Sequence, residues 1–163
     1  MPSWSPSPLE ALVAVAIGSS LLAVAVPEFL ADLRASRLAE PVDGLKRIGE
    51  GALAYAAVHG VAEAFPGPVA LTPAEIPRAR RLDDPPGAWG HPTWRALGFS
   101  FDHPHAFGFA FDSSLGPGLS RFRATAHGDL DGDGVVSTFE IEGRADASGA
   151  TLLPGMFVDR EVE

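Results

Sequence analysis

The chain of 163 residues contains no cysteine. Disulfide bonds and thiolate-bound zinc are therefore excluded. A basic cluster is also lacking, because the densest group of arginines, at residues 78–81, is followed at once by Asp83 and Asp84. We do not expect the chain to bind nucleic acid, since proteins that do so present an uncompensated basic surface.

Enzyme signatures are missing as well. The sequence has no G-x-S-x-G nucleophile motif, and it has neither of the glycine-rich phosphate motifs, G-x-x-x-x-G-K and G-x-G-x-x-G. We therefore expect the protein not to be an enzyme.

Charge is scarce at the N-terminal end, although the whole chain carries a formal net charge of −9. Glu10 is the only charged residue among residues 1–26, and residues 9–26 are otherwise apolar or small, up to Pro27. A run of this length can cross the hydrocarbon layer of a membrane as a helix. A carboxylate in such a span costs roughly 2.5–3.5 kcal/mol at the bilayer centre and less near an end, so its presence indicates a function.

Three interpretations of this segment stay open. It can be a cleaved signal peptide with residues 23–25, A-V-A, as the cleavage site, although residues 1–8 contain no Lys or Arg. It can be a plain membrane anchor, in which Glu10 has no role. It can also be an anchor that doubles as an assembly surface, in which Glu10 is the essential residue. We favour the third, because ionisable groups in membrane segments are usually functional.

An amphipathic helix is predicted over residues 29–62. Apolar side chains recur mostly every three or four residues there, and charged side chains fall largely on the other faces. Pro27 and Pro41 interrupt the pattern, and each removes a helical hydrogen bond, so a kink or break is expected at both. If the pieces are continuous, residues 9 to about 62 form one helix roughly 80 Å long.

Residues 63–98 form a proline-rich segment. Seven prolines between residues 66 and 92 leave no room for a long regular element. We interpret this segment as a surface connection held in place by Trp89 and Trp94 docking on the body of the protein, with a disordered linker as the alternative.

After residue 98 the pattern of apolar residues has a period of two. Three runs alternate apolar and polar side chains, and they lie at residues 107–111, 121–127 and 135–142. Such runs, joined by glycine-rich turns, predict an antiparallel meander with one apolar face. The amphipathic helix is the element available to cover that face.

The predicted fold class is therefore α+β. A long N-terminal helix packs its amphipathic part on a small antiparallel β-meander, and its apolar half protrudes. We predict an apolar membrane or assembly segment at residues 1–28 and a globular domain at residues 29–163. Within the domain, residues 99–163 supply the sheet and a C-terminal tail.

With these elements in place, the sequence resembles the type IV pilin and pseudopilin family of bacteria. The resemblance begins with a glutamate near the start of the apolar segment, Glu10, and a proline seventeen residues later, Pro27. It continues through VAVAIGSSLLAVAVPEFLADLRASR, AEPVDGLKRIGEGALAY, WRALGF, FRATAHGDLDGDGVVSTFEI and the acidic tail FVDREVE. It covers nearly the whole chain, and its most specific parts are the Glu-to-Pro spacing and the GDLDGDG turn.

The resemblance implies a pilin-like fold and a structural role. Such a subunit is anchored in inner-membrane lipid with its domain in the periplasm, and the assembly machinery then extracts it into a helical filament of other copies or related subunits outside the cell. In the family the glutamate pairs with the N-terminal amine of a neighbouring subunit, which implies assembly roles for Glu10 and Pro27. Because Pro6 occupies the family's first mature position and no basic leader precedes it, the resemblance is to a divergent minor subunit.

An acidic loop at residues 129–140 predicts a calcium site. It fits D-x-D-x-D-G-x5-E at every required place, and calcium takes six to eight oxygen ligands. The predicted ligands are Asp129, Asp131, Asp133, the Val135 carbonyl, Ser137 and bidentate Glu140. Because the flanking residues predict strands rather than the helices of an EF-hand, this is a calcium loop in a hairpin. The alternative is a turn rich in Asp and Gly whose carboxylates are solvated.

Histidines offer a weaker pattern. His103 and His105 lie two residues apart and would face one side of a strand, as zinc ligands do, and His127 lies in a predicted strand. A catalytic zinc needs three protein ligands, and no third ligand can be placed, so we expect surface histidines.

Three functional hypotheses follow, and the least favoured of them is a small envelope hydrolase, for which only the residue counts of Ser, His and Asp speak. The first is a non-enzymatic subunit of a type IV pilus-like or secretion pseudopilus filament, which assembles through its apolar helix and binds calcium in its hairpin loop. The second is a secreted or envelope calcium-binding module whose N-terminal segment is a cleaved signal peptide.

Overall fold

The structure, a computed structural model, describes residues 7–161, without the side chains at residues 11, 14, 18, 20–22 and 24–37. The chain divides into two compact units, Met1–Arg37 and Leu38–Glu163. The boundary that we predict after residue 28 is a functional one, between an assembly segment and a globular domain. It stays a prediction.

Helix α1 spans Pro8–Val58 and contributes to both units. It is continuous through Pro27 and Pro41, so the break that their rings favour does not occur. Pro41 is fully buried, and its packing offsets the hydrogen bond that it removes. The helix ends at Val58, and a short 3-10 helix, η1 (Val61–Glu63), follows Gly60.

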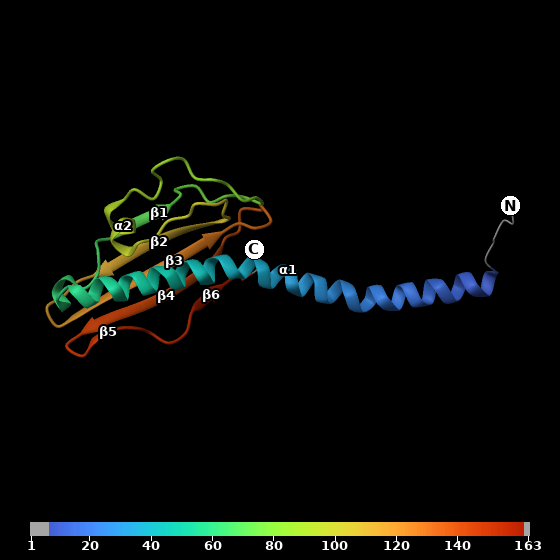
Figure 1. Cartoon of the computed structure of the whole chain (residues 1–163), viewed down its shortest axis with the longest axis horizontal. Helices are drawn as coiled ribbons and strands as arrows, with labels where there is room; N and C mark the ends of the chain where they lie inside the picture. The colour runs from blue at the N-terminus through green and yellow to red at the C-terminus, as the bar shows by residue number, and fades with distance from the viewer. Residues whose placement is uncertain (1–6, 162–163) are drawn as a thin grey trace. The chain divides into compact units, whose positions relative to one another are not determined.

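An antiparallel sheet of six strands within residues 7–161 makes up most of the second unit. The strands are β1 (Val69–Thr72), β2 (Phe107–Ser114), β3 (Leu119–Gly128), β4 (Ser137–Asp146), β5 (Gly149–Leu152) and β6 (Phe157–Asp159). They lie in the order β1-β2-β3-β4-β5, and β6 pairs with the part of β4 that β5 leaves free. Figure 1 shows β3 and β4 as long neighbouring arrows.

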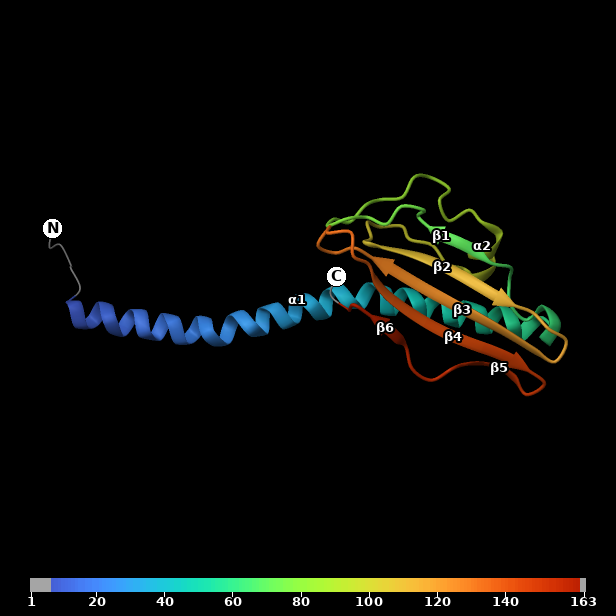
Figure 2. The same cartoon turned by 180° about the vertical axis from the view of Figure 1, so that it is seen from behind.

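One face of the sheet carries the core. Burial alternates along β3, and the register places Ala126 between Phe109 of β2 and Phe139 of β4 on the buried face. Residues 38–58 of α1 cover this face, which is seen from the helix side in Figure 1 and from the sheet side in Figure 2. The fully buried apolar side chains of this helical part are Pro41, Leu45, Ile48 and Ala52.

The proline-rich segment is ordered by its aromatic residues. Trp94 lies in helix α2 (Pro92–Leu97) and is fully buried, and Trp89 is 8% exposed. Their ring centroids are 5.4 Å apart, and both rings contact Phe99. The predicted docking of the two tryptophans on the body is therefore confirmed.

The predicted fold class is wrong. The long helix with a protruding apolar half on a small meander is replaced by a domain that is mostly a six-stranded sheet, covered by residues 38–58 of α1. Among the described residues, no helix is both long and apolar enough to cross a membrane. The runs at residues 107–111 and 121–127 lie in β2 and β3, and the run at residues 135–142 lies in β4 from Ser137 onward. The other strands have three or four residues each, too few for a periodic pattern to appear.

Candidate metal centre

The acidic loop connects the two longest strands of the sheet. The pairing of β3 with β4 ends at Gly128 and Ser137, and residues 129–136 form the connection between them. The hydrogen bonds between β3 and β4 hold Gly128 opposite Ser137, so the two ends of the loop stay at a fixed distance from each other. The sequence supplies glycines where the turn needs them: Gly132 and Gly134 have φ angles of 84° and 91°, which side chains other than glycine rarely adopt.

Three carboxylates converge in this loop. Oxygens of Asp129, Asp131 and Asp133 lie within 4.8 Å of one another. Asp129 is buried, with 2% of its surface exposed, whereas the other two are exposed. Like charges at this separation repel one another, and a cation between them removes the repulsion. The group can therefore hold a metal ion.

The loop backbone orients each of these carboxylates. Gly132 donates its N–H to Asp129 Oδ1 (2.8 Å), Asp133 donates to Asp131 Oδ1 (3.1 Å), and Val135 donates to Asp133 Oδ1 (2.7 Å). In each case one oxygen accepts a bond from the loop, and the side chain keeps a second oxygen for another partner. The three side chains are therefore oriented before any ion binds.

Arg78 is the nearest cation to the buried carboxylate. Its Nε lies 3.7 Å from Asp129 Oδ2, and 73% of its side chain is exposed. Ala79 donates its N–H to the carbonyl oxygen of Asp129 at 2.9 Å, which holds this part of the proline-rich segment against the loop. The arginine therefore compensates part of the charge of Asp129 from the solvent side.

The other predicted ligands lie outside this group of three. Ser137 is buried in β4, and its Oγ donates to the carbonyl oxygen of Gly128 at 3.0 Å. Glu140 pairs in register with Thr125, and its Oε1 lies 3.1 Å from Arg123 Nε. Val135 contributes the N–H bond to Asp133 described above. The ligand roles of Val135, Ser137 and Glu140 stay predictions.

The two predicted assembly residues lie in α1. Glu10 and Ser7 form a reciprocal pair: the N–H of Ser7 donates to Glu10 Oε2 (2.7 Å), and the N–H of Glu10 donates to Ser7 Oγ (3.3 Å). This is a capping box, which satisfies two backbone donors at a helix start. Pro27 has helical backbone, and its side chain lies outside the described residues. The assembly roles of both residues stay predictions.

The histidines have unequal environments. His103 is exposed as expected, with Nδ1 2.8 Å from Asp102 Oδ1. His105 is 1% exposed, so its expected surface position is wrong; the isolated bridge between Leu82 and His105 turns it inward. His127 is half-buried in β3 with Nδ1 3.0 Å from Thr138 Oγ1, and burial lowers its pKa.

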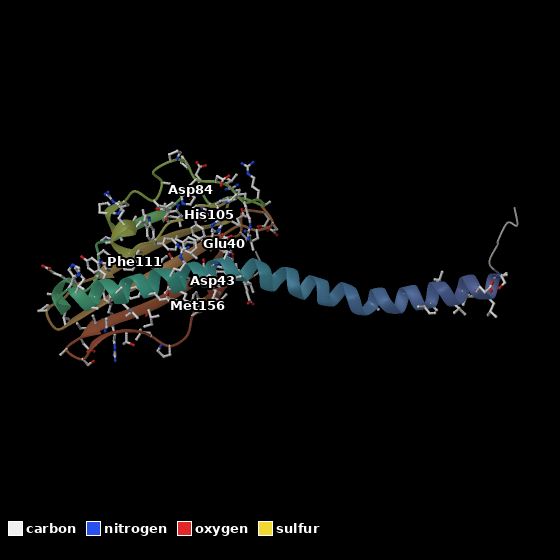
Figure 3. All side chains as sticks on the ribbon, in the orientation of Figure 1. Glu40, Asp43, Asp84, His105, Phe111 and Met156 are labelled. Carbon is white, nitrogen blue, oxygen red and sulfur yellow. The ribbon has the colours of Figure 1, made fainter. Side chains whose placement is uncertain are left out.

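Glu40 is a buried carboxylate that the sequence analysis missed. Its Oε1 accepts the N–H groups of Ala106 (2.7 Å) and Phe107 (3.0 Å), and its Oε2 lies 3.3 Å from Arg81. It joins α1 to the start of β2, and Figure 3 labels it on the helix. No local pattern marks this role, because its partners lie 66 and 67 residues further along the chain. By contrast, the S-x-x-E capping box at Ser7 is visible in the sequence.

Comparisons with protein-family models, curated proteins and solved structures found no match to this chain.

Proposed function

We propose that this protein is a structural subunit of a filament in the cell envelope, related to type IV pilins and pseudopilins. In this proposal it assembles with other copies through the N-terminal part of α1 and binds calcium in the β3–β4 loop. The observation that carries the proposal is a set of exposed apolar side chains on α1. Their exposed fractions are 73% for Leu9, 69% for Leu12, 48% for Val13, 67% for Val15 and 57% for Ile17.

Most of these side chains share one face of the helix. Leu9, Leu12, Val13 and Ile17 follow one another at steps of three, one and four residues, and residues three or four apart are neighbours on a helix surface. Large contiguous apolar patches usually mark interaction sites. Burying such a surface against other chains contributes about 25 cal/mol per Å². Equivalent helices of other copies supply a partner of the same chemistry.

Glu10 has a place in this proposal beside the apolar face. Within the described residues, its Oε2 is engaged with Ser7, and its Oε1 has no hydrogen bond. A carboxylate that becomes buried among apolar helices needs a cation, since an isolated buried charge is costly. We assign that pairing to the N-terminal amine of a neighbouring copy.

Removal of the apolar face tests the assembly. We expect Leu12→Ser combined with Ile17→Ser to abolish large assemblies of the full chain in sedimentation velocity and filaments in electron micrographs. Val58→Ser is the matched control, because Val58 lies on the same helix and is 79% exposed. It should assemble as the wild type does. Assembly of the double variant at wild-type concentrations would refute the proposal.

The native N-terminus distinguishes the alternative of a secreted calcium-binding module. Mass spectrometry of the native protein should find the segment that contains Leu12 and Ile17 in the mature chain. A chain that begins at Val26 or Pro27 would mean that the segment is a discarded signal peptide.

Calcium binding is tested by thermal unfolding of the full chain. Calcium at about 100 times its Kd stabilises a protein by roughly 2.7 kcal/mol, and we expect a rise in Tm of about 8 °C that EDTA reverses. Asp131→Asn should remove the response, because it takes one carboxylate from the group of three. Asp159→Asn changes an exposed acid elsewhere and should retain it. A Tm that is the same with calcium and with EDTA would show that the loop is only a turn.

A further inference from the structure

A second site lies on the domain, in the proline-rich segment. A cavity of about 260 Å³ is formed by residues 83–89 on one side and residues 101–103 on the other. Aromatic and proline side chains line it, together with Asp83, Asp84 and Asp102. No lysine or arginine is among its lining residues. The cavity therefore combines an apolar lining with acidic side chains.

Asp84 is the most strongly positioned of the three acids. Its Oδ2 accepts the indole N–H of Trp89 (2.5 Å) and lies 2.7 Å from His105 Nε2. The other ring nitrogen of His105, Nδ1, lies 2.7 Å from the carbonyl oxygen of Phe107. Figure 3 labels Asp84 and His105 close together on the domain. Two neighbours thus fix the carboxylate in one orientation.

The second oxygen of Asp84 has no hydrogen-bond partner among the described residues. The side chain is 10% exposed, and Oδ1 has no hydrogen bond to any described residue. Every fully buried side-chain polar atom in the described part of the chain has a partner. Oδ1 therefore has some surface in contact with open space, and Asp84 is among the residues that line the cavity.

The remaining lining matches an organic cation. Trp89 and Phe101 form the aromatic part, with ring centroids 5.8 Å apart. Asp83 and Asp102 are exposed at the rim, where His103 Nδ1 lies 2.8 Å from Asp102 Oδ1. Aromatic rings attract cations through their faces. The guanidinium of Arg47 already lies 5.7 Å from the Phe101 ring centroid, and the same ring stacks on His105.

A bare metal ion does not fit the same lining. A metal site needs several ligand oxygens converging on one point, and within the described residues the three acids of this cavity do not form such a group. An alkyl chain, by contrast, can contact the prolines and aromatic rings while its charged end reaches Asp84.

We propose that this cavity binds a basic side chain, the ammonium group of lysine or the guanidinium group of arginine, presented by another protein chain. The charged end donates to Asp84 Oδ1, the rim acids Asp83 and Asp102 add attraction, and the aliphatic stem packs on Trp89 and Phe101. The site is independent of the acidic loop and of the apolar face of α1.

Titration of the ¹⁵N-labelled full chain tests the proposal, with the indole N–H signal of Trp89 as the reporter. N-acetyl-lysine methylamide and N-acetyl-arginine methylamide should shift that signal saturably. N-acetyl-norleucine methylamide, which has a similar stem without the charge, should not. Shifts with the norleucine derivative equal to those with the lysine derivative would overturn the assignment.

Substitution of the two exposed acids, Asp83 and Asp102, provides a second test of the site. Asp83→Asn combined with Asp102→Asn should weaken binding of the lysine derivative by about tenfold, since two exposed carboxylates that attract the cation are removed. Both residues are exposed, so the fold is retained. Asp112→Asn combined with Asp159→Asn removes the same charge from other exposed positions and should change the affinity less than about twofold. If both double variants lost the same affinity for the lysine derivative, net charge alone would explain binding. That result would contradict the proposed site.

Discussion

At the scale of single residues, Glu10 has a local contact and a proposed distant one. The capping box with Ser7 explains why a carboxylate stabilises the first turn of α1. Pairing with the amine of another copy explains why a carboxylate would be kept beside an apolar face. The two roles depend on different properties of the side chain, because a cap needs an acceptor oxygen, whereas pairing with an amine needs a negative charge.

Glu10→Gln separates these roles, since glutamine also serves in a capping box but has no charge. We expect the helical content of the full chain, measured by circular dichroism, to stay at the wild-type value. The concentration at which assemblies form should rise by about tenfold or more, which corresponds to about 1.4 kcal/mol. Glu10→Ala, which lacks both properties, should lower the helical content and raise the concentration at which assemblies form. Wild-type assembly by the glutamine variant would limit Glu10 to its role as a cap.

Individual site residues could be predicted where the partners are local. The converging carboxylates of Asp129, Asp131 and Asp133 follow from their spacing in a tight loop, and the sequence contains the whole pattern. The surroundings of Glu40 and His105 depend on partners 21 to 67 residues away. Such contacts arise only when α1 and the proline-rich segment have packed on the sheet, so no local pattern indicates them.

At the scale of elements, glycines set how closely α1 approaches its neighbours. A Cβ atom at Gly51 would lie 2.1 Å from the carbonyl oxygen of Leu97, at the end of α2. A Cβ atom at Gly44 would lie 2.5 Å from the ring of Phe109. The helix can therefore pack against α2 and β2 only with glycine at these positions, although glycine lowers helix propensity.

Gly51→Ala tests this packing. Alanine improves helix propensity by about 1 kcal/mol, but the backbone of Leu97 cannot yield as a side chain does, so we expect a net loss of about 3 kcal/mol in the free energy of unfolding. Urea unfolding of the full chain measures it. Gly49→Ala is the control on the same helix, because its Cβ would meet only side-chain atoms of Ile141 and Leu152, at 3.1 Å or more. Equal stability of the Gly51→Ala variant and the wild type would contradict the packing.

Long strands could be predicted from the sequence, whereas short strands could not. The strands β2, β3 and β4 have eight or ten residues, enough for alternation to be visible. The strands β1, β5 and β6 have three or four, and they form because a longer neighbour offers its free edge. A kink or break is expected at Pro41 because its ring removes a helical hydrogen bond. The helix nevertheless continues, because the buried ring of Pro41 gains packing contacts that the sequence does not reveal.

At the scale of the whole molecule, the two compact units have different surfaces. The first, Met1–Arg37, carries the cluster of exposed apolar side chains between Leu9 and Ile17 of α1. The second, Leu38–Glu163, carries the core, the acidic loop and the aromatic cavity. We propose that the first unit supplies the contact between copies, while the second is stabilised by calcium and presents the surface that other proteins meet.

The absence of cysteine permits a direct measurement of that contact, because one introduced thiol is unique in the full chain. Packed helices lie about 8–10 Å apart, so a flexible bis-maleimide should join Leu12→Cys chains of neighbouring copies into covalent dimers on a denaturing gel. Val58→Cys, equally exposed on the same helix, should remain monomeric. The account predicts this difference, and cross-linking of Leu12→Cys no greater than that of Val58→Cys would contradict it.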